Sequence, residues 1–174
     1  DLDEMEKEGL LVPILIVLVI LGIILVFVFS GDNTFKTGNV SFQYPSSWSQ
    51  DHTVGEFNST ALYSEVTLTK DVAAGNTTQT AYIVLQMQKR TEGVLQLPSA
   101  SALAGNTTNS SVSTVDVAGF KASQLANFGP NLSQKITIIK TQDFYYTIEY
   151  ITPTGALNET EDAYSTIIQS LTII

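Results

Sequence analysis

The chain has 174 residues, a formal net charge of −9, no cysteine and a single histidine. The absence of cysteine excludes disulfides, thiol catalysis and cysteine-ligated metals. The acidic balance argues against nucleic acid as a partner, because nucleic-acid binding requires a basic face. About 144 residues follow the first thirty, which is enough for one domain with a real core.

The chain opens with an acidic tail, residues 1–9, that holds five acids and one lysine. Residues 10–29 then read LLVPILIVLVILGIILVFVF, without a charge. A helix of this length spans about 30 Å, the thickness of a bilayer's hydrocarbon core. A cleaved signal peptide would have a shorter apolar region, a basic start and a small-residue cleavage site. The sequence therefore predicts a retained transmembrane or assembly helix over 10–30 and a linker over 31–38.

Alternating apolar and polar residues predict β-structure from Val40 onward. Strands are expected over 40–44, 62–69 and 80–88, with a turn over 71–76 between the last two. Residues 98–105 begin with proline and end with glycine, which predicts a short helix. A loop rich in Ser, Thr and Asn is expected over 106–113, and then a hairpin over 115–126 that turns at Ala118-Gly119.

The C-terminal third predicts a strand pair over 135–141 and 143–152, because its residues are β-branched and aromatic. Asn158 as N-cap and Glu161 as capping-box residue predict a helix to about residue 169, with Ala163, Ile167 and Ser170 on one face. A last short strand is expected over 171–174. The expected fold class is α+β: an N-terminal hydrophobic helix, then an antiparallel β-sheet sandwich with two helices, the domain covering residues 39–174.

Asparagine residues carry the second strong signal. The chain has nine, and seven of them begin an N-x-[ST] sequon: Asn39, Asn58, Asn76, Asn106, Asn109, Asn131 and Asn158. A quarter of the residues after Ser30 are Ser or Thr, so chance would give about two. Sequons are used only outside the cytoplasm, and all seven follow the apolar stretch. We therefore predict N-linked glycans on an outer domain, with the acidic tail inside.

Candidate catalytic and metal-binding residues are few. His52, the single histidine, has Asp51 and Glu56 nearby in sequence, but this spacing is unspecific for a metal or for a Ser-His-Asp arrangement. The G-x-S-x-G elbow and the glycine-rich phosphate loops are absent. We accordingly predict no enzymatic activity, no catalytic or metal-binding residues and no cofactor.

Three other features have a structural and a functional interpretation. Three acids, Glu159, Glu161 and Asp162, lie at the start of the expected C-terminal helix, where negative charge is stabilised by the helix dipole. A cation site is the alternative interpretation. The pair Lys89-Arg90 is expected at a strand end and in solvent. Trp48, the only tryptophan, is expected in an aromatic core beside Phe42 and Tyr44; lining a ligand pocket is the alternative.

The segment Gly38-Asn-Val-Ser-Phe-Gln-Tyr-Pro-Ser-Ser-Trp48 resembles the opening phrase "G-(I/V)-S-F-x-Y-P-x-x-W" of the PsbP-like superfamily. Three later segments also fit the pattern of this superfamily: Val117-Ala-Gly-Phe-Lys-Ala122, Asp143-Phe-Tyr-Tyr146 and the helix end at Ile167-Ile-Gln-Ser-Leu171. The chain looks like the membrane-anchored versions found in methanogenic archaea. The resemblance covers about residues 35–174 and implies an α–β–α sandwich and a non-enzymatic binding or assembly role, with no ion-binding residues carried over.

Two functions follow as expectations. In the first, residues 10–29 anchor the chain in membrane lipid, and the outer domain binds or organises an unidentified partner at the cell surface. In the second, the same residues pack against copies of themselves in an extracellular, pilin-like filament. The second expectation places five acids beside a packed apolar core, where unpaired charge is costly.

Overall fold

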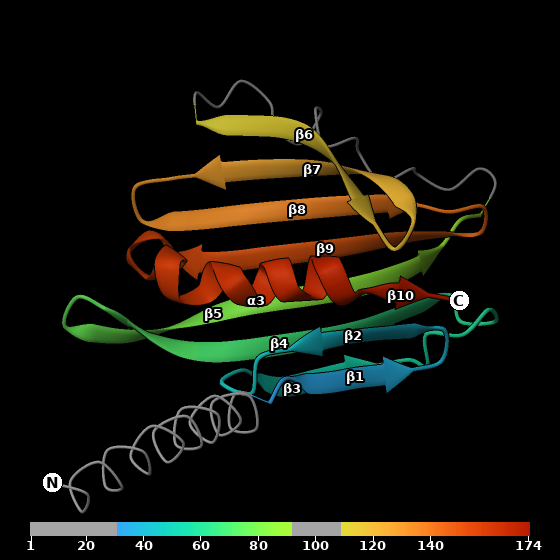
Figure 1. Cartoon of the computed structure of the whole chain (residues 1–174), viewed down its shortest axis with the longest axis horizontal. Coiled ribbons are helices and arrows are strands. Elements are labelled where there is room, and N and C mark those ends of the chain that lie inside the picture. Colours follow the sequence, from blue (N-terminus) through green and yellow to red (C-terminus); the bar gives the residue numbers. More distant parts are fainter. Residues whose placement is uncertain (1–30, 92–108) are drawn as a thin grey trace, which may run out of the picture. The chain divides into compact units, whose positions relative to one another are not determined.

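In the part of the domain that the structure describes, two antiparallel sheets pack with one α-helix (Figure 1). The structure, a computed structural model, describes residues 31–91 and 109–174. The first half of the chain gives β1 (Asn33–Thr37), β2 (Val40–Tyr44), β3 (Ser49–Val54), β4 (Tyr63–Ala74) and β5 (Thr77–Lys89). The second half gives β6 (Ser110–Val117), β7 (Phe120–Phe128), β8 (Leu132–Lys140), β9 (Phe144–Pro153), the 3-10 turn η1 (Thr154–Ala156), α3 (Leu157–Ser170) and β10 (Thr172–Ile173).

The large sheet has seven strands in the order β3-β4-β5-β9-β8-β7-β6, and the small sheet has three in the order β1-β2-β10. Consecutive strands of the large sheet form hairpins except β5 and β6; β5 instead pairs with β9, with Leu85 opposite Ile148. In the small sheet, β10 returns from the end of the chain to pair with β2. Figure 1 shows α3 and the small sheet on the same face of the large sheet. The opposite face carries no helix or strand of the described residues, and we call it the open face.

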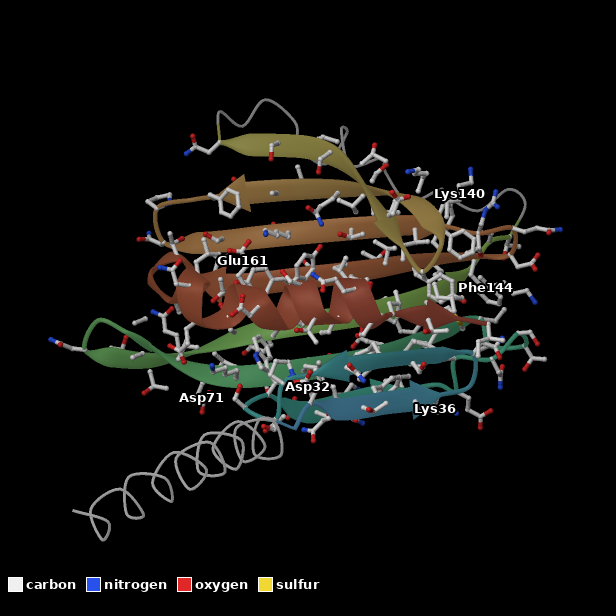
Figure 2. All side chains as sticks on the ribbon, viewed as in Figure 1. Asp32, Lys36, Asp71, Lys140, Phe144 and Glu161 are labelled. Atoms are coloured by element: carbon white, nitrogen blue, oxygen red, sulfur yellow. The ribbon has the colours of Figure 1, made fainter. Side chains whose placement is uncertain are left out.

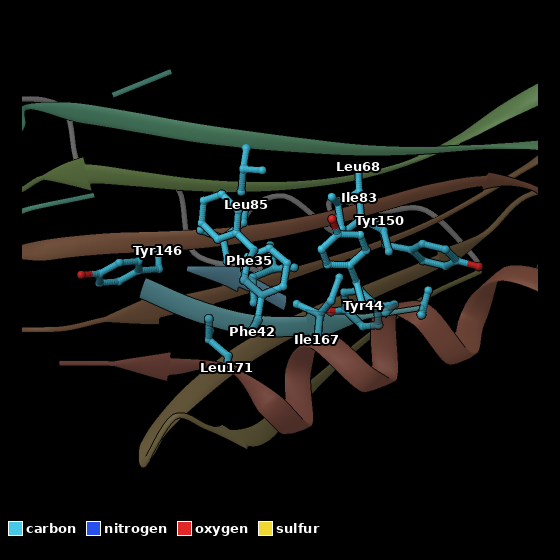
Figure 3. Close-up of a cluster of buried hydrophobic side chains, with 14 of the residues drawn as sticks. Phe35, Phe42, Tyr44, Leu68, Ile83, Leu85, Tyr146, Tyr150, Ile167 and Leu171 are labelled. Carbon is cyan, nitrogen blue, oxygen red and sulfur yellow. The ribbon is translucent and has the colours of Figure 1, made fainter. Parts of the chain in front are cut away.

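The core lies between the large sheet and the layer formed by α3 and the small sheet. Strands β4, β5 and β9 bury every second residue toward it, as the period of a half-covered sheet requires. Figure 3 shows the aromatic side chains Phe35 and Phe42 of the small sheet beside Leu85. Phe35 stacks on Phe42 at 5.0 Å between ring centroids and meets Phe57 edge-on at 5.6 Å. Trp48 is buried in the same core, 2% exposed.

Helix α3 is attached to the large sheet by polar contacts as well as by Ala163 and Ile167. The Tyr164 hydroxyl is hydrogen-bonded to Thr137 on β8. Lys135 on β8 forms an ion pair with Glu161, whose place on α3 is seen in Figure 2. Among the described residues, no buried side-chain nitrogen or oxygen lacks a hydrogen-bond partner. These contacts fix the helix in one orientation on the sheet.

One loop is held by a close backbone approach. Gly38, in the β1–β2 turn, has φ +54°, and a Cβ there would lie 2.2 Å from the carbonyl oxygen of Glu56. Phe57 is completely buried and also has a positive φ, 51°. The Asn39 N–H donates to the Phe57 carbonyl at 2.9 Å. The β1–β2 turn and the β3–β4 connection are therefore packed together, and only glycine fits at position 38.

The predicted α+β class is wrong as a description of this part of the chain. Most of residues 31–91 and 109–174 are strand, and α3 is the one α-helix among them, so the two-helix arrangement is not found. The predicted N-terminal hydrophobic helix (10–30) is not among the described residues, and the predicted helix over 98–105 also lies outside them. No helix in the described ranges is long and apolar enough to cross a bilayer. A β-sandwich with one covering helix is the observed architecture.

Strand was under-predicted where a strand lies at a sheet edge. The sequence predicts a linker at β1 and a loop at the start of β6, and it assigns no element at β3. Edge strands bury few residues, so they lack apolar alternation. The expected turn over 71–76 is strand to Ala74. The hairpin turn at Ala118-Gly119 is confirmed, and both residues have positive φ. The expected strand over 40–44 and the strand pair β8–β9 are confirmed, the pair with shifted ends.

The predicted cap of the C-terminal helix is wrong. The N-cap is Ala156, without a side-chain hydrogen bond, and Asn158 lies within the first turn of α3. The 3-10 turn η1 runs directly into the helix, so the helix begins before the expected capping residue. Glu161 pairs with Lys135 instead of returning to a capping residue. Ala163 and Ile167 are buried on one face, as predicted.

Candidate functional site

Four of the predicted glycosylation sites lie at one end of the domain. They are the exposed residues Asn76, Asn109, Asn131 and Asn158. Asn76 is in the β4–β5 turn, Asn109 precedes β6, Asn131 is in the β7–β8 turn, and Asn158 is in the first turn of α3. These turns and element starts gather at the left of Figure 1. The Asn131 carbonyl accepts from the Thr154 N–H at 3.0 Å, which joins the β7–β8 turn to the start of α3.

Two further sequons lie at the opposite end, and both asparagines are half-buried. The Asn39 carbonyl accepts from the N–H of the C-terminal Ile174 at 2.9 Å. The Asn58 side-chain oxygen accepts from the Thr60 hydroxyl at 2.8 Å, and its amide nitrogen donates to Glu56 at 2.8 Å. Asn58 therefore closes an Asx turn. The seventh predicted site, Asn106, lies outside the described residues.

The open face of the large sheet carries a polar cluster that sequence analysis did not single out. The Tyr63 hydroxyl donates to the Glu65 carboxylate, and the Gln86 amide donates to the same carboxylate at 2.9 Å. Partial burial of the phenol, together with the hydrogen bond and charge of Glu65, raises the pKa of Tyr63 to about 12. The Tyr63 hydrogen bond lowers the pKa of Glu65. At neutral pH the cluster is a neutral phenol hydrogen-bonded to a carboxylate, so it presents hydrogen-bonding groups and one negative charge.

The open face also presents most of the large apolar side chains that solvent reaches. Cross-strand register places on it Val54, Tyr63, Tyr82, Val112 and Leu132, which are 41–52% exposed. Scattered single apolar residues are normal on a protein surface. Here they share one face, which makes this face the candidate contact surface.

The acidic residues and the histidine that were considered as candidate metal ligands do not lie together. Among residues 31–91 and 109–174, no group of three or more His, Asp or Glu is close enough to hold a metal ion. His52 lies on β3, whose six residues are all exposed. Glu159 forms an ion pair with Lys70 at 3.1 Å, and Glu161 pairs with Lys135. These acids attach α3 to the sheet.

Arg90 differs from its prediction. It was expected in solvent with Lys89, but its guanidinium donates to the Thr141 and Gln142 carbonyls at 2.7 Å each and lies over the Tyr145 ring at 5.4 Å. It therefore closes the β8–β9 turn against the end of β5. Its partners are about fifty residues away in sequence, so no local pattern indicates this role.

The core interpretation of Trp48 is confirmed by its burial.

Comparison with known proteins gives fold information only. No family model matches the chain, and no curated protein matches it. The solution structure of cyanobacterial PsbP (CyanoP) from Synechocystis sp. PCC 6803 matches with a TM-score of 0.54 and 10% identity, over 83% of this chain and 94% of that one.

Two crystal structures match more weakly. A protein from Bacteroides thetaiotaomicron has a TM-score of 0.48 and 16% identity, and the match spans 83% of this chain but 49% of that one. LpqN of Mycobacterium tuberculosis, which is involved in cell envelope biogenesis, has a TM-score of 0.45 and 17% identity, over 82% and 90%. The resemblance first indicated by Gly38–Trp48 is thus confirmed at the level of the fold: the domain has a PsbP-like fold.

Proposed function

We propose that this protein is a non-enzymatic cell-surface glycoprotein, anchored once in the membrane by the apolar residues 10–29, with residues 39–174 outside as a binding or assembly domain. The observation that carries the proposal is the asymmetry of the sequons: all seven follow the apolar stretch and none precedes it. Sequons are modified only outside the cytoplasm, so this asymmetry favours one crossing with the acidic tail inside.

The geometry of the domain supports this proposal in two ways. The six sequon asparagines of the described residues lie in turns or at element ends, and the four exposed ones leave room for a glycan. The glycans would stand at the ends of the strands, leaving the open face between them free. That face, with its exposed apolar residues and the Tyr63–Glu65 cluster, is suited to protein contact.

A fractionation experiment tests the anchor. We expect detergent, and neither high salt nor shear, to release the native protein from membranes. In the double variant Leu18→Arg/Leu21→Arg the central charges each cost about 3 kcal/mol of insertion, so the protein should appear in the soluble fraction. The matched variant Leu18→Ile/Leu21→Ile should stay in the membrane.

Two measurements decide between the proposal and its alternatives. Intact filaments recovered from sheared, detergent-free medium would contradict the anchor and favour a pilin-like subunit that packs through residues 10–29. The mass of the intact native protein tests the glycans. A mass equal to that of the bare polypeptide contradicts the glycoprotein.

A further inference from the structure

The four sequons with exposed asparagines differ in the accessibility of their hydroxyl residue. In the sequons of Asn76 and Asn109, the third residues, Thr78 and Ser111, are exposed. In the sequons of Asn131 and Asn158, the third residues are Ser133 and Thr160, and both are 0% exposed. The asparagine is at the surface in every case, so the hydroxyl alone separates two open sequons from two closed ones.

The two buried hydroxyls are part of the folded structure. Thr160 Oγ1 donates to the Ala156 carbonyl at 2.9 Å, and it is hydrogen-bonded to the Tyr150 hydroxyl at 2.8 Å and to Thr152 Oγ1 at 3.0 Å. Ser133 Oγ lies 3.0 Å from Thr154 Oγ1. An enzyme can reach these hydroxyls only when α3 or the β7–β8 turn leaves the sheet.

The chemistry of N-glycosylation makes this difference matter. A lipid-linked oligosaccharide is the donor. The bond between its anomeric carbon and the lipid phosphate breaks, and the phosphate leaves with the bonding electron pair. Asparagine Nδ2 forms a bond to that carbon, and the proton that the amide loses passes to a base of the transferase or to solvent. The transferase selects the acceptor by the hydroxyl two residues after the asparagine, which is why the motif requires Ser or Thr there. A sequon whose hydroxyl is enclosed presents the amide without its recognition element.

We propose that folding sorts these sequons: Asn76 and Asn109 accept a glycan in the folded domain, whereas Asn131 and Asn158 accept one only before the domain folds. This inference rests on the proposed function, because it takes the protein to be a glycoprotein. Beyond the proposed function, the inference specifies which asparagines carry glycans and whether they receive them before or after folding. If folding precedes transfer, glycans stand on the β4–β5 turn and before β6, and the start of α3 remains bare.

The test uses the full-length chain, produced without glycans in a host that lacks the transferase and purified in detergent. It is incubated with an oligosaccharyltransferase and a lipid-linked oligosaccharide, and the occupancy of each site is measured by peptide mass spectrometry. The unfolded control is the double variant Leu85→Asp/Ile148→Asp, which places two carboxylates at facing core positions that are 1% and 0% exposed. Fluorescence of Trp48 reports whether each chain is folded.

In the folded chain we expect Asn76 and Asn109 to be modified at least about tenfold faster than Asn131 and Asn158, since the closed sites react only through local opening. In the unfolded variant all four sites should be modified at similar rates. Equal rates at the open and closed sites of the folded chain would overturn the inference. So would a failure of Asn76 and Asn109 in the folded chain when the unfolded variant accepts at both.

The failure of the proposed function looks different. If native protein has the mass of the bare polypeptide, the glycoprotein itself is refuted, whatever the transferase does in vitro. If native protein carries glycans but the folded chain accepts them equally at all four sites, only the sorting by folding is refuted. A Thr160→Ser variant keeps the sequon and the buried hydroxyl, so its Asn158 should remain as slow as in the parent.

Discussion

The contact between the β1–β2 turn and the β3–β4 connection predicts a large difference between two glycine substitutions. Gly38 and Gly75 both have positive φ, +54° and +64°, so alanine at either position adds about 1–2 kcal/mol of backbone strain. A Cβ at position 75 meets nothing within 4 Å, whereas at position 38 it meets backbone atoms of Glu56 and Phe57 at 2.2–2.7 Å. Only Gly38→Ala should therefore disturb the neighbouring chain.

The additional cost at position 38 follows from what must move. Displacing the Glu56–Phe57 backbone breaks the hydrogen bond from the Asn39 N–H, worth about 1 kcal/mol. It also exposes part of the fully buried Phe57 side chain, worth about 2 kcal/mol. Gly38→Ala should then lower the free energy of unfolding by about 4–5 kcal/mol, and Gly75→Ala by about 1–2 kcal/mol.

Urea unfolding followed by Trp48 fluorescence measures this difference, because Trp48 is the only tryptophan and is buried. With an m-value of about 2 kcal/mol/M, the midpoint should fall by about 2 M for Gly38→Ala and by less than about 1 M for Gly75→Ala. Equal shifts in the two variants would refute the reasoning, since they would show that the loop accommodates a Cβ without loss.

Three other predictions concern single side chains. Thr160→Val should lower the free energy of unfolding by about 1–3 kcal/mol, because it removes a hydrogen-bond partner of the Tyr150 and Thr152 hydroxyls. Thr160→Ser keeps the hydroxyl and should change the free energy of unfolding little, and the urea midpoints of the two variants test this difference. The pKa of Glu65 is lowered in the folded state, so this carboxylate contributes stability above its ordinary pKa of 4.5, and the contribution is lost as the pH falls. Tyr63→Phe should therefore reduce the fall in melting temperature between neutral and acidic pH. An unchanged pH dependence of the melting temperature would contradict the stabilising role of the Tyr63–Glu65 hydrogen bond. Arg90→Met should increase amide exchange in the β8–β9 turn while Lys89→Met leaves it unchanged, because only Arg90 donates to that turn's carbonyls.

Much of the fold was predictable where local chemistry is unambiguous. Central strands such as β2 and β9 bury every second residue, so their alternation is visible in the sequence. The turn at Ala118-Gly119 carries its own signal, because glycine tolerates positive φ. The phrase from Gly38 to Trp48 indicated the PsbP-like fold. Edge strands such as β3, all six residues of which are exposed, left no periodic trace.

The candidate site was predicted only in part. The asparagines that can be acceptors are evident from the amino-acid sequence, because the motif is three consecutive residues. The sequence also determined the lack of thiol chemistry and the acidic charge, since these depend on composition. The Tyr63–Glu65–Gln86 cluster was not predicted, because Gln86 comes from the neighbouring strand and the register brings it opposite Glu65.

The exposure of each sequon hydroxyl, in contrast, depends on how the folded chain packs. Thr78 and Thr160 have the same place in their motifs, yet Thr78 lies on an exposed hairpin end and Thr160 is on α3 and enclosed between the helix and the large sheet. The difference depends on residues distant in sequence, Tyr150 and Thr152 on β9, that pack over Thr160. Burial is a property of the packed chain, so a motif of three residues specifies the chemistry of a site and the fold decides its accessibility.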